Sequence, residues 1–188
     1  MQTLRMLNAG AAVIIMLLFI ASEIRAQVSL TGGGAKLFFV DPEGIESAIG
    51  IGLFADLGEV LNRTRLEAHL DYWSKSYEFG VDAGSSSFRD IAISAMAKYM
   101  MDSPRPELRP FIGGGLSLHV FRSKFTAKYF TEPESISKSE AKIGIDLGGG
   151  AFYAINPQIE LLAELKFRLV SDINQLMITV GALYNLGK

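Results

Sequence analysis

The chain lacks cysteine altogether and has only two histidines among its 188 residues. Without cysteine there are no disulfides, no thiol catalysis and no thiolate metal sites, and two histidines disfavour a histidine-rich metal site. The 18 basic and 20 acidic residues nearly balance, so the protein has no large positive field to attract nucleic acid. We therefore expect neither a nucleic-acid partner nor a metal or other cofactor.

Long apolar runs are also missing beyond residue 26, so no later segment is expected to cross a membrane as a helix. The start of the chain differs: Arg5 precedes the apolar run of residues 9–21, and Ala26 offers a small residue for cleavage. This run is shorter than the ~18–20 residues of a spanning helix. The pattern predicts a secretory signal peptide over residues 1–26, cleaved near Ala26, with a short membrane anchor as the alternative. Residues 27–188 then form one exported domain.

The stretch RTRLEAHLDYW, residues 63–73, alternates charged or polar side chains with apolar ones from Arg65 onward. In a strand this period of two gives one charged face and one apolar face. Leu66, Leu70 and Trp73 also lie at helical spacing, so the stretch by itself allows either structure.

The same alternation recurs along the chain in segments of about ten residues, separated by turn-forming residues. Glycines occur inside five of these segments, and each would cost a helix roughly 1 kcal/mol. We therefore predict an all-β protein, an eight-stranded antiparallel up-and-down transmembrane β-barrel. The expected strands are residues 30–40, 45–56, 63–73, 88–100, 109–122, 141–153, 159–169 and 175–186. The two longest connections, residues 74–87 and 123–140, share one end and are expected to be outward loops.

The polar face is rich in glycine, and this indicates which face of the barrel points outward. A solvent-exposed face has no need of glycine, whereas the narrow lumen of an eight-stranded barrel needs it to make room for long side chains. We therefore place the apolar face in lipid and expect a packed polar interior, not a pore, whose mixed charges pair with one another. The alternative is a secreted, lipocalin-like binding protein whose apolar face lines a cavity. The predicted charge network comprises Arg65, Glu67, His69, Asp71, Lys98, Asp146, Glu160, Glu164, Lys166 and Arg168.

Aromatic residues on the apolar face are sorted toward strand ends, as in the aromatic girdles of transmembrane barrels. We take the first strand to rise from the periplasm. Tyr99, Tyr153 and Tyr184 then fall at the lower ends of descending strands, and Tyr72 and Phe167 at the upper ends of ascending strands. Tyrosines also end strands for other reasons, so this sorting only supports the membrane interpretation.

The C-terminal part of the chain combines several further features. The tracts RPFIGGGLSLHVFR, KIGIDLGGGAFYAINPQIELLAELKFRLV and ITVGALYNLGK have a proline–aromatic start, glycine pairs on alternating strands, an asparagine turn and a glycine–aromatic last strand. In these features residues 109–188 resemble the small eight-stranded outer-membrane β-barrel family of opacity-protein, OmpA-domain and OmpX-like proteins, and the first half matches by its period. We expect a monomer in the outer membrane of a Gram-negative bacterium, with outer-membrane lipid, lipopolysaccharide and the outer-membrane assembly machinery as its partners.

Ser117 and His119 share the polar face, and His69 lies between Glu67 and Asp71 on the third strand. A serine, a histidine and a carboxylate are the parts of a hydrolase triad, and the small-barrel class that the chain resembles includes enzymes that modify lipid A. A lipid-modifying enzyme is therefore the alternative function. We favour the interpretation that these residues fill the lumen, because a triad is recognised by geometry.

Glu160 and Glu164 lie on one strand face near Lys166 and Arg168. Two carboxylates could form a glycosidase-like pair, but salt bridges inside the lumen explain all four residues without one. We therefore expect no catalytic residues.

The tract RSKFTAKYF, residues 122–130, interleaves Arg122, Lys124 and Lys128 with aromatic residues that include Tyr129. Such a loop could bind lipopolysaccharide phosphates or a partner protein. The alternative is that the fifth strand continues above the membrane. The sequence as a whole predicts an outer-membrane barrel with a closed polar lumen and a structural or surface-interaction role through its extracellular loops.

Overall fold

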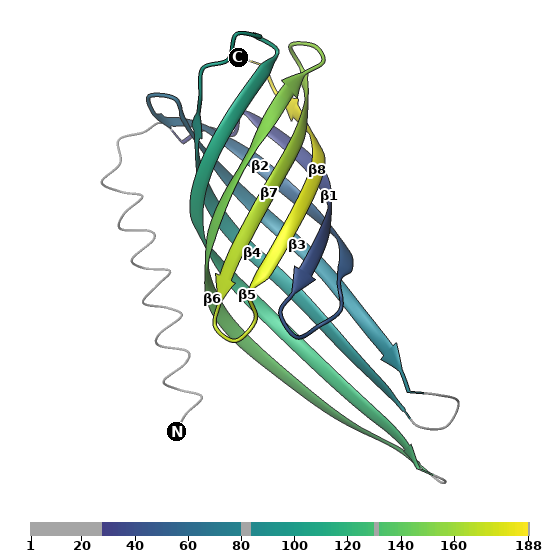
Figure 1. Cartoon of the computed structure of the whole chain (residues 1–188). Helices are drawn as coiled ribbons and strands as arrows, with labels where there is room; N and C mark the ends of the chain where they lie inside the picture. Colours follow the sequence, from purple (N-terminus) through teal and green to yellow (C-terminus); the bar gives the residue numbers. More distant parts are fainter. Residues whose placement is uncertain (1–27, 80–83, 130–131, 188) are drawn as a thin grey trace.

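A computed structural model of the protein describes residues 28–79, 84–129 and 132–187. Antiparallel strands follow one another around a closed barrel in which each strand pairs with its neighbours in sequence, and β8 closes the ring on β1 (Figure 1). The strands are β1 (Gly32–Pro42), β2 (Ala48–Leu61), β3 (Thr64–Glu78), β4 (Ser85–Met100), β5 (Leu108–Tyr129), β6 (Glu132–Ala154), β7 (Ile159–Val170) and β8 (Gln175–Asn185). The predicted eight-stranded up-and-down barrel is confirmed.

The predicted signal peptide and its cleavage site near Ala26 lie outside the described residues. Among the residues that the structure describes, no helix is both long and apolar enough to cross a membrane.

The strands extend further at one end of the barrel than at the other. We call the end that carries the β1–β2, β3–β4, β5–β6 and β7–β8 connections the hairpin end, and the other the terminus end, because β1 starts and β8 finishes there. At the hairpin end β3, β4, β5 and β6 extend beyond the other strands, and β5 and β6 reach furthest (Figure 1). The expectation of two long outward loops is therefore wrong: most of residues 74–87 and 123–140 continue the strands. Apolar alternation predicts only the lipid-facing part of a strand, and backbone pairing continues after the apolar residues stop.

The outer face of the barrel is apolar and the inner face holds the charges. Leu37, Ile51 and Ile93 are each more than half exposed, whereas the side chains of Lys98 and Glu67 have no exposed surface. The alternative of a lipocalin-like barrel with an apolar lumen is therefore wrong, because the apolar side chains point away from the lumen.

Glycines on the inner face make room for larger neighbours, as expected. A Cβ on Gly50 would lie 2.2 Å from the ring of Phe38, and a Cβ on Gly52 would lie 2.3 Å from the Asp71 carboxylate. Both distances are below the contact distance of carbon and oxygen atoms, so no larger residue fits without displacing the neighbour. The narrow lumen thus accommodates aromatic rings and ion pairs because the neighbouring strand has glycine at the positions beside them.

Candidate functional site: the barrel interior and its outer surfaces

The centre of the barrel holds a lysine between two glutamates from different strands. The Lys98 Nζ lies 2.8 Å from Glu67 Oε2 and 3.2 Å from Glu164 Oε1. Lys166 adds a second cation 3.5 Å from Glu164 Oε2, and His69 Nε2 lies 3.2 Å from Glu67 Oε2. All these side chains have no exposed surface. The network therefore ties β3, β4 and β7 together across the lumen.

A second cluster of charges is centred on Arg168, whose guanidinium pairs with Asp71 and, at 3.2 Å, with Asp146. Lys36 of β1 lies 2.8 Å from the same Asp71 carboxylate. Lys36 Nζ also lies within hydrogen-bond distance of His69 Nδ1, at 2.9 Å. His69 thus joins the two clusters, because its other nitrogen lies beside Glu67.

Ser117, His119 and Asp90 lie in a row that resembles a hydrolase triad. His119 Nε2 lies 3.0 Å from Ser117 Oγ, and His119 Nδ1 lies 2.9 Å from Asp90 Oδ2. The carboxylate therefore comes from β4 and not from the third strand, where Glu67 and Asp71 had been considered. Alternation with Ile91 places Asp90 on the inner face, but the sequence does not give the register that brings Asp90 beside His119.

The surroundings of this row are closed. Ser117 is 3% exposed and His119 fully buried, and Ser117 Oγ donates a hydrogen bond to Asp146 at 2.8 Å. The ring of Phe121 stacks on His119 with 5.4 Å between centroids.

Two apolar clusters cover the charges, one near each end of the barrel. The cluster at the hairpin end contains Phe38, Val40, Ala48, Trp73, Phe121, Val170 and Met177. The cluster at the terminus end contains Phe54, Phe111, Phe152, Leu162 and Leu183. The sequence prediction of a packed polar interior missed these apolar residues, because most of them stand among glycines and polar residues on their own strands.

All ten residues of the predicted charge network are buried, but they form more than one group. Arg65 pairs with Asp56 and lies 3.6 Å from Glu160, at the terminus end. Glu160 also pairs with Arg109. Glu160 belongs to this group and Glu164 to the Lys98 group, so the two carboxylates bind different cations.

The predicted girdle residues all point outward. Tyr99, Tyr153 and Tyr184 lie next to the last residues of β4, β6 and β8, and each is about half exposed. Tyr72 and Phe167 lie on the hairpin-end side of the apolar surface, and about two fifths of each is exposed.

The basic tract of residues 122–130 belongs mainly to β5, which runs to Tyr129. The backbone of this tract therefore continues the fifth strand, as the alternative interpretation of the sequence expected. Arg122 and Lys124 are exposed on the outer face, while the side chains of Lys128 and Tyr129 lie outside the described residues.

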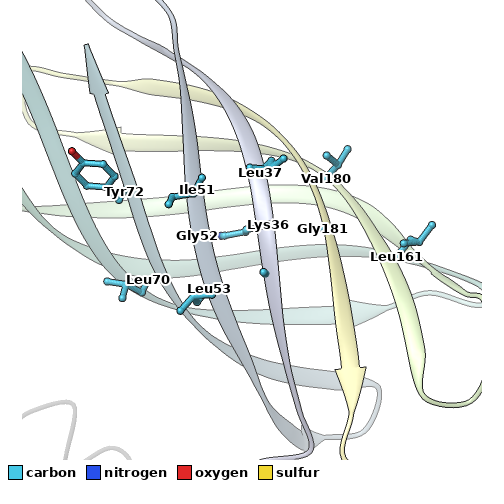
Figure 2. A pocket seen from close by; sticks show the side chains of 11 residues that line it. Lys36, Leu37, Ile51, Gly52, Leu53, Leu70, Tyr72, Leu161, Val180 and Gly181 are labelled. Carbon is cyan, nitrogen blue, oxygen red and sulfur yellow. The ribbon is translucent and has the colours of Figure 1, made fainter. Parts of the chain in front are cut away.

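A shallow groove of about 670 Å³ crosses the outer face over β1, β2 and β8. Figure 2 shows its walls, with Leu70, Leu53 and Ile51 on one side and Val180 and Leu161 on the other. Ala35 also lines the groove, and its side chain is smaller than those of Leu37, Ile51 and Leu53. Its walls carry almost no polar atoms, so only an apolar chain would match them.

Comparisons with known proteins identify the family. The model of the outer membrane protein beta-barrel domain family matches residues 11–185, and no curated protein matches the chain. Among solved structures, Neisserial surface protein A has a TM-score of 0.58 at 16% identity, over 82% of this chain and 96% of that one. Ail, the attachment invasion locus protein of Yersinia pestis, has a TM-score of 0.56 at 17% identity, over 82% and 95%. The N-terminal barrel domain of Pseudomonas aeruginosa OprF has a TM-score of 0.51 at 16% identity, over 84% and 98%. These likenesses concern the fold, whereas the family model covers most of the sequence, and the chain therefore belongs to the outer membrane protein β-barrel domain family.

Proposed function

We propose that this outer-membrane protein is a surface-interaction protein whose closed barrel holds a four-stranded sheet outside the membrane for a partner to bind. The observation that carries the proposal is the free edge of β6. β6 pairs with β7 only from Gly144 onward, although β6 begins at Glu132 and pairs with β5 throughout.

The protruding sheet consists of β3, β4, β5 and β6. β4 pairs with β5 as far as Ser85 and Thr126, and β3 pairs with β4 as far as Glu78 and Ser85. Residues 132–143 of β6 have no other described strand beside them, which leaves ~40 Å of edge at ~3.3 Å per residue. Unpaired edges are templates for an extended segment of another chain.

The composition of this edge suits a selective contact. The segment EPESISKSEAK, residues 132–142, carries a proline and several charges, which are the features that keep an exposed edge from aggregating. A partner must therefore match the charges as well as the backbone, and polar side chains on a pairing strand give specificity in this way.

The experiment excises the hairpin beyond the cross-strand pair Arg122–Ser139 and joins the strands by Asn-Gly, a turn that suits a two-residue hairpin. Peptides selected from a phage-displayed library against the intact protein in detergent are the probe. We expect that they bind the intact protein, that excision removes binding, and that N-methylation of alternate peptide amides also removes it. A heat-dependent mobility shift in gels checks that the shortened barrel folds. Selection of no binding peptide, or binding that survives excision, would refute the proposal.

We also propose that the lumen is closed to ions and that the protein acts as a monomer inserted by the outer-membrane assembly machinery. The support for a closed lumen is the pair of apolar clusters that cover the buried ion pairs at both ends. In planar bilayers the protein should give no resolved conductance steps. Stepwise currents that persist in a highly purified preparation would contradict a closed lumen.

We propose further that the Ser117–His119–Asp90 row is structural and not catalytic. Ser117 is enclosed, and its hydroxyl group lies 2.8 Å from Asp146 Oδ1 as well as 3.0 Å from His119 Nε2, so the Asp146 carboxylate competes with His119 for the hydroxyl proton. Lipid A from cells that produce the wild-type protein should have the same mass spectrum as lipid A from cells that produce Ser117→Ala. A modified lipid A species that depends on Ser117 would show that the protein is an enzyme.

A further inference from the structure

Two arginines face each other on the outer surface of the protruding sheet. Arg89 of β4 and Arg122 of β5 are direct cross-strand partners, and both side chains are exposed. Directly opposed side chains on one face have Cβ atoms ~5 Å apart, and like charges in such a pair repel each other. An anion bound between the two guanidinium groups would remove this repulsion.

The neighbouring positions supply further hydrogen-bond donors. Ser74 of β3 is the partner of Arg89, and Ser139 of β6 is the partner of Arg122. The row across four strands therefore reads Ser, Arg, Arg, Ser. Lys124 lies on the same face two residues beyond Arg122, opposite Ser87. This cationic row contains only donors and hydroxyls, and no carboxylate belongs to it.

Most other cations of the barrel pair with a carboxylate, whereas the cations of the row have no such partner among the described residues. Within residues 28–79, 84–129 and 132–187, no ion pair or side-chain hydrogen bond includes Arg89, Arg122 or Lys124. By contrast, Lys138 and Lys142 of the same hairpin pair with Glu140. Since a planar guanidinium is suited to bidentate contact with phosphate, the pair is equipped for an anion that the described residues do not supply.

The position of the row relative to the apolar surface identifies the source of that anion. The outer-face neighbours two residues toward the barrel centre are Ile91 and Val120, which are again direct partners and nearly half exposed. The arginines are thus the first polar outer-face residues of β4 and β5 beyond the lipid-facing surface. A molecule that covers Ile91 and Val120 with acyl chains would carry its headgroup at the arginines.

We propose that Arg89 and Arg122 form a binding site for a phosphate group of an outer-leaflet lipid, with Ser74, Ser139 and Lys124 as supporting donors. Lipid A, which has both phosphate groups and acyl chains, fits both parts of this surface. The site rests on the outer-membrane location of the barrel and goes beyond the proposed role of the sheet edge, because it binds the face of the sheet and not the β6 edge.

The experiment compares the double variant R89Q/R122Q with a matched control, R63Q/R105Q. The control removes the same charge from exposed arginines at the terminus end. Each protein is delipidated, refolded in neutral detergent and titrated with lipid A that carries two phosphates or with dephosphorylated lipid A, and bound lipid is counted by native mass spectrometry. Inorganic phosphate is added in a third titration to test whether a phosphate group binds the site without the acyl chains.

We expect one lipid A to bind the wild-type protein and the control variant with similar affinity. The affinity should fall at least tenfold in R89Q/R122Q, and by a similar factor in the wild-type protein when lipid A is dephosphorylated. R89K/R122K should bind with intermediate affinity, because lysine keeps the charge and loses the bidentate geometry. Inorganic phosphate should not compete at millimolar concentration.

Three results would overturn the site. The first is an unchanged affinity for lipid A in R89Q/R122Q. The second is an equal loss of affinity in the control variant, which would indicate general electrostatic attraction. The third is full competition by inorganic phosphate, which would indicate that the ligand is a soluble anion. The heat-dependent mobility shift establishes that each variant is folded. If R89Q/R122Q does not fold, R89K/R122K decides: a lipid A affinity below that of the wild-type protein supports the site, and an unchanged affinity overturns it. Since hairpin excision beyond the Arg122–Ser139 pair leaves both arginines in place, the excised protein should still bind lipid A even if its edge binds no peptide.

Discussion

Removal of the Lys98 ammonium is the most direct test of the buried charge network. In Lys98→Met the two glutamates that lie 2.8 and 3.2 Å from the ammonium would lose it while remaining buried. Loss of one partner of a buried ion pair typically costs ~3–5 kcal/mol, because the charge that remains is uncompensated. Here His69 and Lys166 stay beside the glutamates, so we expect a loss of ~3 kcal/mol, at the lower end of that range.

The measurement is equilibrium unfolding by guanidinium chloride in lipid vesicles, followed by the fluorescence of Trp73, the single tryptophan. Trp73 is buried on the inner face, so its emission should report the opening of the barrel. In Lys98→Met/Glu67→Gln one of the two uncompensated charges is absent, and this double variant should regain ~1–2 kcal/mol relative to Lys98→Met. Lys138→Met, which removes an exposed lysine of the protruding hairpin, should leave the unfolding midpoint unchanged.

The charge argument would be refuted by either of two results. The first is a loss below ~1 kcal/mol in Lys98→Met, which is the size of an ordinary surface ion pair. The second is a double variant less stable than Lys98→Met, which would show that the glutamate contributes through its own packing and not through the charge balance. The comparison holds only if the free energy of unfolding depends on denaturant concentration with the same slope in the wild-type protein and in each variant.

Three further outcomes follow from the same geometry. Gly50→Leu should destabilise the barrel by ~1–3 kcal/mol or more, because its side chain would overlap an aromatic ring, whereas Gly33→Ala, with open space at the Cβ position, should unfold like the wild type. The ammonium of Lys138 hydrogen-bonds the Glu140 carboxylate and lowers its pKa below the ordinary value, so any stabilisation from this pair is present above the ordinary glutamate pKa and lost as the pH falls through the lowered one. NMR titration should show the Glu140 pKa rising in Lys138→Gln, and an unchanged pKa would contradict the contact. Brominated lipid should barely quench Trp73 in vesicles, since its indole points into the lumen, and strong quenching would mean that the two faces are assigned the wrong way round.

The alternation of the sequence predicts the fold well because each strand obeys one physical rule. A residue such as Leu70 must face lipid and its neighbour Asp71 must face the lumen, so the period of two records the environment of every second side chain. Glycine at positions such as Gly50 and Gly52 shows which face is crowded, and thereby which face is inside. The closure of β8 on β1 follows from the number of strands and the need to pair both edges in a membrane.

The parts that the sequence did not predict depend on relations between distant residues. The contact between Asp90 and His119 joins positions 29 residues apart, and that between Arg168 and Asp71 joins positions 97 residues apart. The register of the strands decides which carboxylate meets which cation, and alternation does not contain the register. The length of β5 was underestimated for a different reason: beyond Val120 the outer-face positions hold Arg122, Lys124 and Thr126 in place of apolar residues, so the lipid-facing pattern ends although the strand continues.

The Arg89–Arg122 pair shows why inward and outward charges must be judged by different rules in a membrane barrel. A cation of the lumen such as Lys98 has no access to water or lipid headgroups, so it must find its carboxylate within the chain. An outward arginine at the edge of the apolar surface meets a membrane whose headgroups carry phosphate, and the chain need not supply its counter-ion. A pair of like charges that would be a fault in the lumen is therefore consistent with stability at this position. The proposed lipid site would supply the partner that these arginines lack among the described residues. The inner-face network, where each cation has a carboxylate within 4 Å, shows that the same sequence provides partners where none is available from outside.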